Sequence, residues 1–126
     1  MEVAKLNADL VGEKSGSAAA KAKFERWSAM PGWLVVTCDK SDDEIRARED
    51  YAACACAIQN MMLYLWDEGI GVKWTTGAVT REPRFYDIIW ADPDVEYVVG
   101  LLWYGYAQEV PMIRRKEVHE ISVNLP

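Results

Sequence analysis

The chain has 126 residues, of which 51% are hydrophobic and 27% are charged, and its formal net charge is −6. This length and composition fit one globular domain and exclude an intrinsically disordered chain. The acidic balance argues against a nucleic-acid partner, because phosphate backbones are bound by clustered Lys and Arg, and the basic cluster here is only the short run 114–116.

Residues 1–17 start with charges inside a weakly apolar stretch and end in a polar run that contains Gly and Ser. We expect this segment to be flexible, and its charges argue against a cleaved signal peptide. No apolar run approaches the roughly 20 residues that a membrane-spanning helix needs. With an odd number of cysteines, these features predict a cytoplasmic protein without a membrane segment.

The first half of the remaining chain predicts a helix, a strand and a long helix. Residues 18–30 are rich in Ala and Lys, which favour a helix, and Pro31-Gly32 ends it. The apolar run 33–38 is typical of a buried strand. The long helix starts at Ile45 or Glu49 and ends at Glu68, with Gly69 as its C-cap. Almost every face of residues 52–66 is apolar, which predicts a central helix that is packed on most sides.

The second half predicts shorter elements and one dominant strand. Residues 72–76 form a short strand before Gly77, and residues 82–89 form a helix with Pro83 in its first turn. Residues 95–105 are apolar nearly throughout, which predicts a strand in the centre of a sheet. A terminal strand is expected over residues 121–125. Helices and strands mixed in this order indicate the α+β class.

The metal-binding and thiol candidates are few. His119 is the only histidine, which excludes a multi-histidine metal site. Cys54 and Cys56 would point about 200° apart on a helix. We therefore favour core thiols over a disulfide or a thiol redox centre formed by this pair.

The turn Trp74-Thr75-Thr76-Gly77 is the best ligand-binding candidate in the chain. It offers two hydroxyls, an indole and backbone N–H groups, which suit a phosphate or a polyol chain. Taken alone, such a turn is more often plain structure than a binding site.

The motifs in their order resemble the C-terminal part of the FMN-dependent nitroreductase family. The matching segments are Glu49-Asp-Tyr-Ala-Ala53, Gln59-Asn60-Met61, Gly69-Ile-Gly71, Trp74-Thr-Thr-Gly77, Asp94 before Val98-Val-Gly100, and Tyr104-Gly105-Tyr106. Together with the helix and strand before them, they extend the resemblance over roughly residues 18–126.

The resemblance implies an α+β fold with a central antiparallel or mixed sheet, assembled as an intertwined homodimer. It implies FMN at the dimer interface, passing hydride from NAD(P)H to nitroaromatics, quinones or similar acceptors. Carried over by position, Trp74, Thr75, Thr76 and Gly77 would hold FMN, and Arg114 would bind its phosphate. Thr75 departs from the pattern, because many members have Arg or Lys at this position.

A second departure is the family's opening Arg-Arg-Ser-x-Arg motif, which binds the FMN phosphate and has no counterpart in residues 1–17. The chain therefore resembles one nitroreductase-like domain over 1–126, truncated at its N-terminus, that pairs with a second copy or with a complementary N-terminal fragment. Apolar surface on the long helix and on the strand 95–105 would then be uncovered. The alternative is a decayed, flavin-free member that serves as a structural or interaction module.

Overall fold

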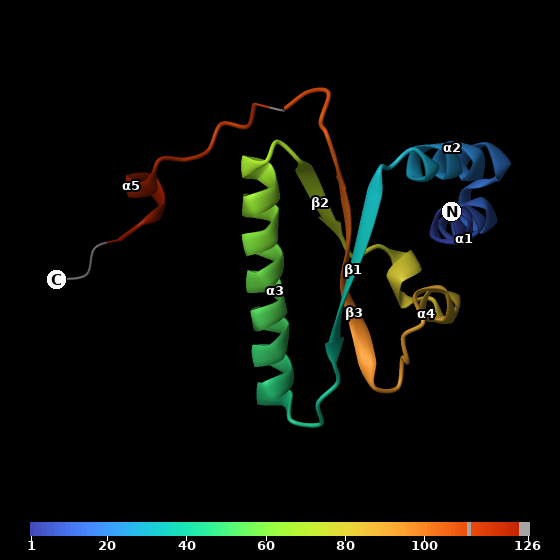
Figure 1. Ribbon diagram of the computed structural model, residues 1–126, viewed down its shortest axis with the longest axis horizontal. Coiled ribbons are helices and arrows are strands. Elements are labelled where there is room, and N and C mark those ends of the chain that lie inside the picture. The colour runs from blue at the N-terminus through green and yellow to red at the C-terminus, as the bar shows by residue number, and fades with distance from the viewer. Residues whose placement is uncertain (111, 124–126) are drawn as a thin grey trace.

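The computed structural model describes residues 1–110 and 112–123. Figure 1 shows a small sheet standing between one long helix on one side and a group of shorter helices on the other. In chain order the elements are α1 (Glu2–Ser15), α2 (Ser17–Ser28), β1 (Gly32–Asp39), α3 (Glu44–Asp67), β2 (Gly71–Thr75), the 3-10 helix η1 (Ala78–Arg81), α4 (Pro83–Ile89), β3 (Glu96–Gly105) and α5 (Val118–Ile121).

The sheet is antiparallel, with three strands in the order β1-β3-β2. β3 lies in the centre, as its apolar sequence predicts, and pairs Trp103 with Trp33 of β1 and Leu102 with Trp74 of β2. Its residues Val99, Leu101, Leu102 and Trp103 are only 0–7% exposed and belong to the hydrophobic core. The expectation that β3 would have an uncovered apolar face is therefore wrong, since helices cover both of its faces.

Each face of the sheet has its own hydrophobic cluster. On the side of α1, α2 and α4, the buried residues include Leu6, Trp27, Phe85, Leu101 and Trp103. On the side of α3, the buried residues are Cys38, Ile58, Val99 and Leu102. From Leu101 to Trp103 successive β3 side chains alternate between the two clusters, as the pleat of a strand requires. Val99 and Leu101 lie in different clusters because the pairing of β1 with β3 shifts register at Val36/Thr37, opposite this point of β3.

The N-terminal segment is helical, so the expectation of a flexible stretch over residues 1–17 is wrong. α1 buries Leu6, Asn7 and two alanines. Gly12 belongs to this helix, and a Cβ on it would lie 3.2 Å from the Ala20 Cβ, so it allows α1 and α2 to approach closely. Gly16 makes the turn between them with φ +85°, a conformation that suits glycine.

The long helix α3 is covered on one side only. Asp43 caps it by accepting hydrogen bonds from the backbone N–H groups of Ile45 (2.8 Å) and Arg46 (3.3 Å), and Gly69 follows it with φ +76°. Ile58 is its one buried residue, whereas Tyr64 and Trp66 are 64% and 55% exposed. The predicted packing on most sides is therefore wrong.

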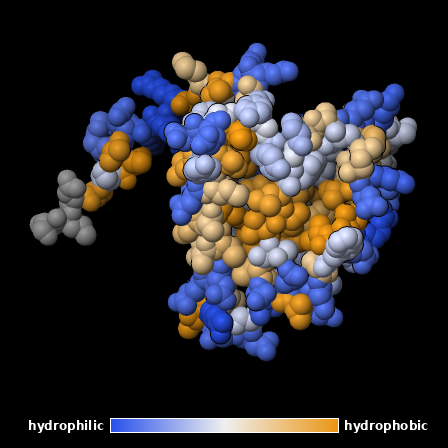
Figure 2. All heavy atoms as spheres, in the orientation of Figure 1, coloured by the Kyte–Doolittle hydropathy of each residue, from blue (hydrophilic) through white to orange (hydrophobic). Residues whose placement is uncertain are grey.

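Hydrophobic side chains reach the surface beside α3 as well. Figure 2 shows them gathered over the strands between α3 and the α1–α2 pair. Leu34 of the edge strand β1 is 40% exposed. Cys56 is exposed on α3, so it is not the core thiol that was expected, whereas Cys38 is buried.

After β3 the chain leaves the body of the domain and runs past the end of α3 (Figure 1). Every described residue from Tyr106 to Val123 is exposed. Of the strand expected over residues 121–125, Ile121 lies in α5, Ser122 and Val123 are not in a strand, and the remainder is outside the described residues. None of the helices within residues 1–110 and 112–123 is long and apolar enough to cross a membrane.

Candidate functional site

Strand β2 places its side chains alternately on the two faces of the sheet. Val72 and Trp74 pack into the cluster under α3, and the Trp74 indole N–H donates to the Val99 carbonyl at 3.3 Å. Lys73 and Thr75 lie on the opposite face, toward α1 and α2. Neighbouring residues of the expected binding turn are therefore separated by the sheet itself.

The turn that follows β2 is fixed by its own hydrogen bonds. The Gly77 carbonyl accepts from the Thr80 backbone N–H at 3.1 Å and from the Thr80 hydroxyl at 2.9 Å. The Thr76 carbonyl accepts from the Arg81 guanidinium at 3.2 Å. Thr80 is buried, so this turn holds Gly77 in one place at the edge of the helix-covered face.

A pocket of about 330 Å³ lies between this turn and the α1–α2 pair. Gly77 leaves it open, because a Cβ at this position would meet only the Thr75 hydroxyl oxygen, at 3.9 Å. The lining residues are Asn7, Leu10, Val11, Lys14, Lys23, Arg26, Trp27, Lys73, Thr75, Gly77, Ala78, Val79 and Trp103.

Tryptophans form one wall of this pocket. The rings of Trp27 and Trp103 lie 5.0 Å apart in an edge-to-face arrangement, and Trp33 lies 4.9 Å from the first and 5.3 Å from the second. Such geometry is favourable between aromatic rings. The wall is therefore an apolar surface of mutually inclined aromatic rings.

Three donors at this wall have no acceptor among the described residues. They are the Asn7 amide nitrogen and the indole nitrogens of Trp27 and Trp103, all buried. A buried donor without a partner costs about 1–3 kcal/mol, and such groups are few in native proteins. The three nitrogens are themselves closed off from solvent, so they are unsatisfied groups of the packed core beside the pocket.

The expected site residues are thus only partly brought together. Thr75 and Gly77 line the pocket, whereas the Trp74 side chain lies on the other face of the sheet and Thr76 is an exposed turn residue. Arg114 lies in the C-terminal segment, beside a separate small cavity that also involves Arg115, Lys116, Glu117 and Glu120. Asn7, Lys23 and Arg26 were missed, because no local motif marks them.

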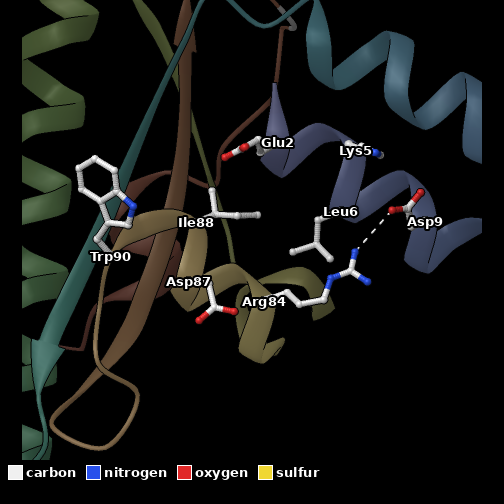
Figure 3. A pocket seen from close by; sticks show the side chains of 8 residues that line it. All are labelled: Glu2, Lys5, Leu6, Asp9, Arg84, Asp87, Ile88 and Trp90. Carbon is white, nitrogen blue, oxygen red and sulfur yellow. Dashed lines mark hydrogen bonds and ion pairs between the residues drawn. The ribbon is translucent and has the colours of Figure 1, made fainter.

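Figure 3 shows a second pocket, of about 510 Å³, between α1 and α4. Its lining carries charges of both signs, from Glu2, Asp9 and Asp87 and from Lys5 and Arg84. The Arg84 guanidinium lies 3.5 Å from the Asp9 carboxylate. Three carboxylates thus stand against two cations, and one of the cations is already paired with a carboxylate of the chain. This pocket is therefore a weaker candidate for a charged ligand than the one beside β2.

The three cysteines line neither of these two pockets: Cys38 is buried on β1, Cys54 is half-buried on α3 and Cys56 is exposed on α3. Burial raises the pKa of the Cys54 thiol, and a hydrogen bond with Cys38 raises it further. A raised pKa lowers the thiolate fraction at neutral pH, which disfavours nucleophilic chemistry. The pairing of Cys54 with Cys38 gives no support to a thiol redox centre made of Cys54 and Cys56.

The chain is similar to known proteins along most of its length. Residues 2–106 match the Nitroreductase family. The chain belongs to the nitroreductase family. The match begins at residue 2, so it includes α1, which the resemblance in sequence had left out, and it ends before Arg114.

Individual relatives agree with the family. The chain is 28% identical over 87 residues to YfhC of Bacillus subtilis (strain 168), which is named as a candidate NAD(P)H nitroreductase, and these residues are 69% of this chain and 44% of YfhC. A nitroreductase-like family protein from Bacillus cereus superposes with a TM-score of 0.74 at 27% identity, covering 97% of this chain and 64% of that one. The chain thus spans about half to two thirds of the length of these relatives.

A more distant nitroreductase structure shares the fold. It comes from Desulfovibrio desulfuricans, is described as a complex with FMN, and superposes with a TM-score of 0.62 at 16% identity. The superposition covers 97% of this chain and 66% of that one. The α+β nitroreductase fold predicted from the sequence is therefore confirmed.

Proposed function

We propose that this nitroreductase-family chain is part of an FMN-dependent oxidoreductase that uses NAD(P)H to reduce nitroaromatic, quinone or similar acceptors. The family, the name of the Bacillus subtilis relative and the FMN complex of the Desulfovibrio protein support this class. The observation that carries the proposal here is the pocket beside β2, where Thr75 and Gly77 meet the tryptophan wall of Trp27 and Trp103.

The residues present fit a flavin nucleotide. When bound, FMN would supply the hydride chemistry, and the protein would supply binding and orientation. The Thr75 hydroxyl can donate to or accept from a polar ring edge or a ribityl hydroxyl. Gly77 keeps the turn free of a side chain, and the indoles of Trp27 and Trp103 give an apolar wall that excludes water.

The test is flavin uptake by the purified chain. We expect added FMN to be retained on gel filtration, with a flavin absorption band in the protein peak and quenched flavin fluorescence. NAD(P)H oxidation that depends on added quinone is expected in the same fractions. A colourless protein that leaves all added FMN in the small-molecule fraction would overturn the proposal for this chain.

We also propose that the active form is a homodimer joined along the outer face of α3. Ile45, Ala52, Cys56, Leu63 and Trp66 are all exposed and recur at spacings of three, four and seven residues. This is the spacing of a helix face that packs against another helix. Ile45, Leu63 and Trp66 are 63%, 57% and 55% exposed, which is costly for a face left in water.

Leu63→Lys tests this assembly by placing a charge within the row, between Cys56 and Trp66. We expect the wild-type chain to sediment as a dimer and the variant as a monomer at the same concentration. Ala57→Lys is the matched control, because Ala57 is exposed on α3 outside the row. If the wild-type chain stays monomeric over a 100-fold range of protein concentration, the dimer is refuted.

The exposed α3 face also favours a second candidate function, a flavin-free structural or interaction module. The two functions make opposite predictions in one experiment. A stable dimer that takes up no FMN and oxidises no NAD(P)H would favour the module, and retained FMN would exclude it.

A further inference from the structure

The pocket beside β2 collects an unusual set of charges. Lys14 comes from α1, Lys23 and Arg26 come from α2, and Lys73 comes from β2. We propose that these four cations bind the phosphate monoester group of the ligand. The inference rests on the proposed function in that FMN is one source of such a group, but a phosphorylated dinucleotide or free phosphate offers the same chemistry.

The positions of three of the cations are set by the tryptophan wall. The Lys23 ammonium lies 5.6 Å from the centroid of Trp27, and Lys73 and Arg26 lie 5.2 Å and 5.9 Å from the Trp103 ring. Cations over indole faces are attracted by the ring quadrupole. The wall thus holds positive charge at the pocket before any ligand arrives, which reduces the ordering cost of binding.

No acidic residue lines this pocket. Within residues 1–110 and 112–123, none of the four cations forms an ion pair with a carboxylate. This contrasts with the chain as a whole, where 20 acidic residues outnumber 14 Lys and Arg. Four uncompensated like charges repel one another, and an anion among them removes that repulsion.

The cluster also answers a difficulty raised by the sequence. The resemblance to the family implies an Arg-rich opening motif for the phosphate, and residues 1–17 do not contain it. The folded chain instead assembles basic residues from positions that are up to 59 residues apart, between Lys14 and Lys73. Lys14 comes from a helix that was expected to be unstructured.

The test compares flavins with and without phosphate. We expect FMN to bind at least 10-fold more tightly than riboflavin by flavin fluorescence titration, and the difference to shrink as salt is raised. Lys23→Gln combined with Lys73→Gln should weaken FMN binding at least 10-fold and riboflavin binding less than 2-fold. Lys21→Gln is the matched control, because Lys21 lies on α2 and faces Glu25 at 3.9 Å instead of the pocket.

Two further measurements identify the source of the phosphate group. They also separate the phosphate site from the proposed FMN-dependent function. Tighter binding of NADPH than NADH, or line broadening of inorganic phosphate in phosphorus NMR that the double variant abolishes, supports the site without any flavin. If the chain binds phosphate but no flavin, the phosphate site is supported, and the proposed FMN-dependent function is overturned.

Two outcomes overturn the phosphate site. If FMN and riboflavin bind equally and the double variant changes neither affinity, the phosphate site is refuted, and the proposed FMN-dependent function stands. Absence of binding by FMN, NADPH and inorganic phosphate refutes both. Near-UV circular dichroism checks that the variants fold, and Lys73→Gln alone replaces the double variant if the latter unfolds.

Discussion

The two sides of the sheet differ in how many of their polar and charged groups find a partner within the chain. Under α3, the Trp74 indole finds the Val99 carbonyl and packs directly across Gly100. Under α1 and α2, the indoles of Trp27 and Trp103 have no acceptor among the described residues, and four cations lie nearby without carboxylates. The same strand, β2, serves both sides. One side is a packed core, and the other is a core with an open pocket at its edge.

The largest effect is expected from Gly100→Val, which tests the packed side. The new side chain would occupy the space of the Trp74 indole. Overpacking of this kind costs about 3 kcal/mol of the free energy of unfolding, measured by urea denaturation. Gly77→Val is the matched control, since its Cβ meets little, and should change stability by less than about 0.5 kcal/mol. Equal losses in the two variants would contradict the comparison.

Asn7→Leu tests the side of the sheet under α1 and α2. Here we expect the free energy of unfolding to rise, whereas Gly100→Val should lower it. Removing a buried donor that has no acceptor, and filling its space with apolar atoms, should raise the free energy of unfolding by about 1 kcal/mol. Destabilisation of the free protein would mean that the Asn7 amide is already satisfied.

Gly77→Val should leave the fold unchanged and fill the pocket. We expect flavin affinity to fall at least 10-fold in fluorescence titrations, with the urea midpoint of the free protein unchanged. Gly77→Ala should give an intermediate loss, because it adds fewer atoms at the same backbone geometry. Wild-type affinity in both variants would place the flavin elsewhere.

The smallest effect concerns pH on the packed side. Burial, then a hydrogen bond with Cys38, raises the pKa of Tyr97 from 10.0 to about 12. A raised folded-state pKa gives stability that is fully present below pH 10 and is lost as pH rises toward 12. Tyr97→Phe should therefore flatten the decline in urea midpoint between pH 9.5 and 11.5. Tyr106→Phe, at a residue 79% exposed, should not.

The fold was largely readable from the sequence where local patterns decide it. The apolar run 95–105 predicted the central strand, Pro83 marked the start of α4, and Gly69 follows α3 with the expected positive φ. α1 was missed because its buried residues include Asn7 and alanines, which carry a weak hydrophobic signal. Its stability comes from packing against α2, which no local pattern contains.

The site was readable only in part, for a similar reason. Thr75 and Gly77 belong to a contiguous motif and were found, whereas Lys14, Lys23, Arg26 and Lys73 converge only in the folded chain. The apolar outer face of α3 looked like core, because hydrophobicity does not distinguish burial by the same chain from burial by another.

The tryptophan cluster makes this chain its own spectroscopic probe. Trp27, Trp33 and Trp103 lie within 5.3 Å of one another, so their near-ultraviolet transitions couple and report on a single location. Two of these rings line the pocket. Occupancy should therefore change the circular dichroism and emission of the unlabelled protein, and a flavin there would accept its excitation energy. A screen of anions could follow the pocket directly, without a cofactor, an assay of turnover or an attached dye.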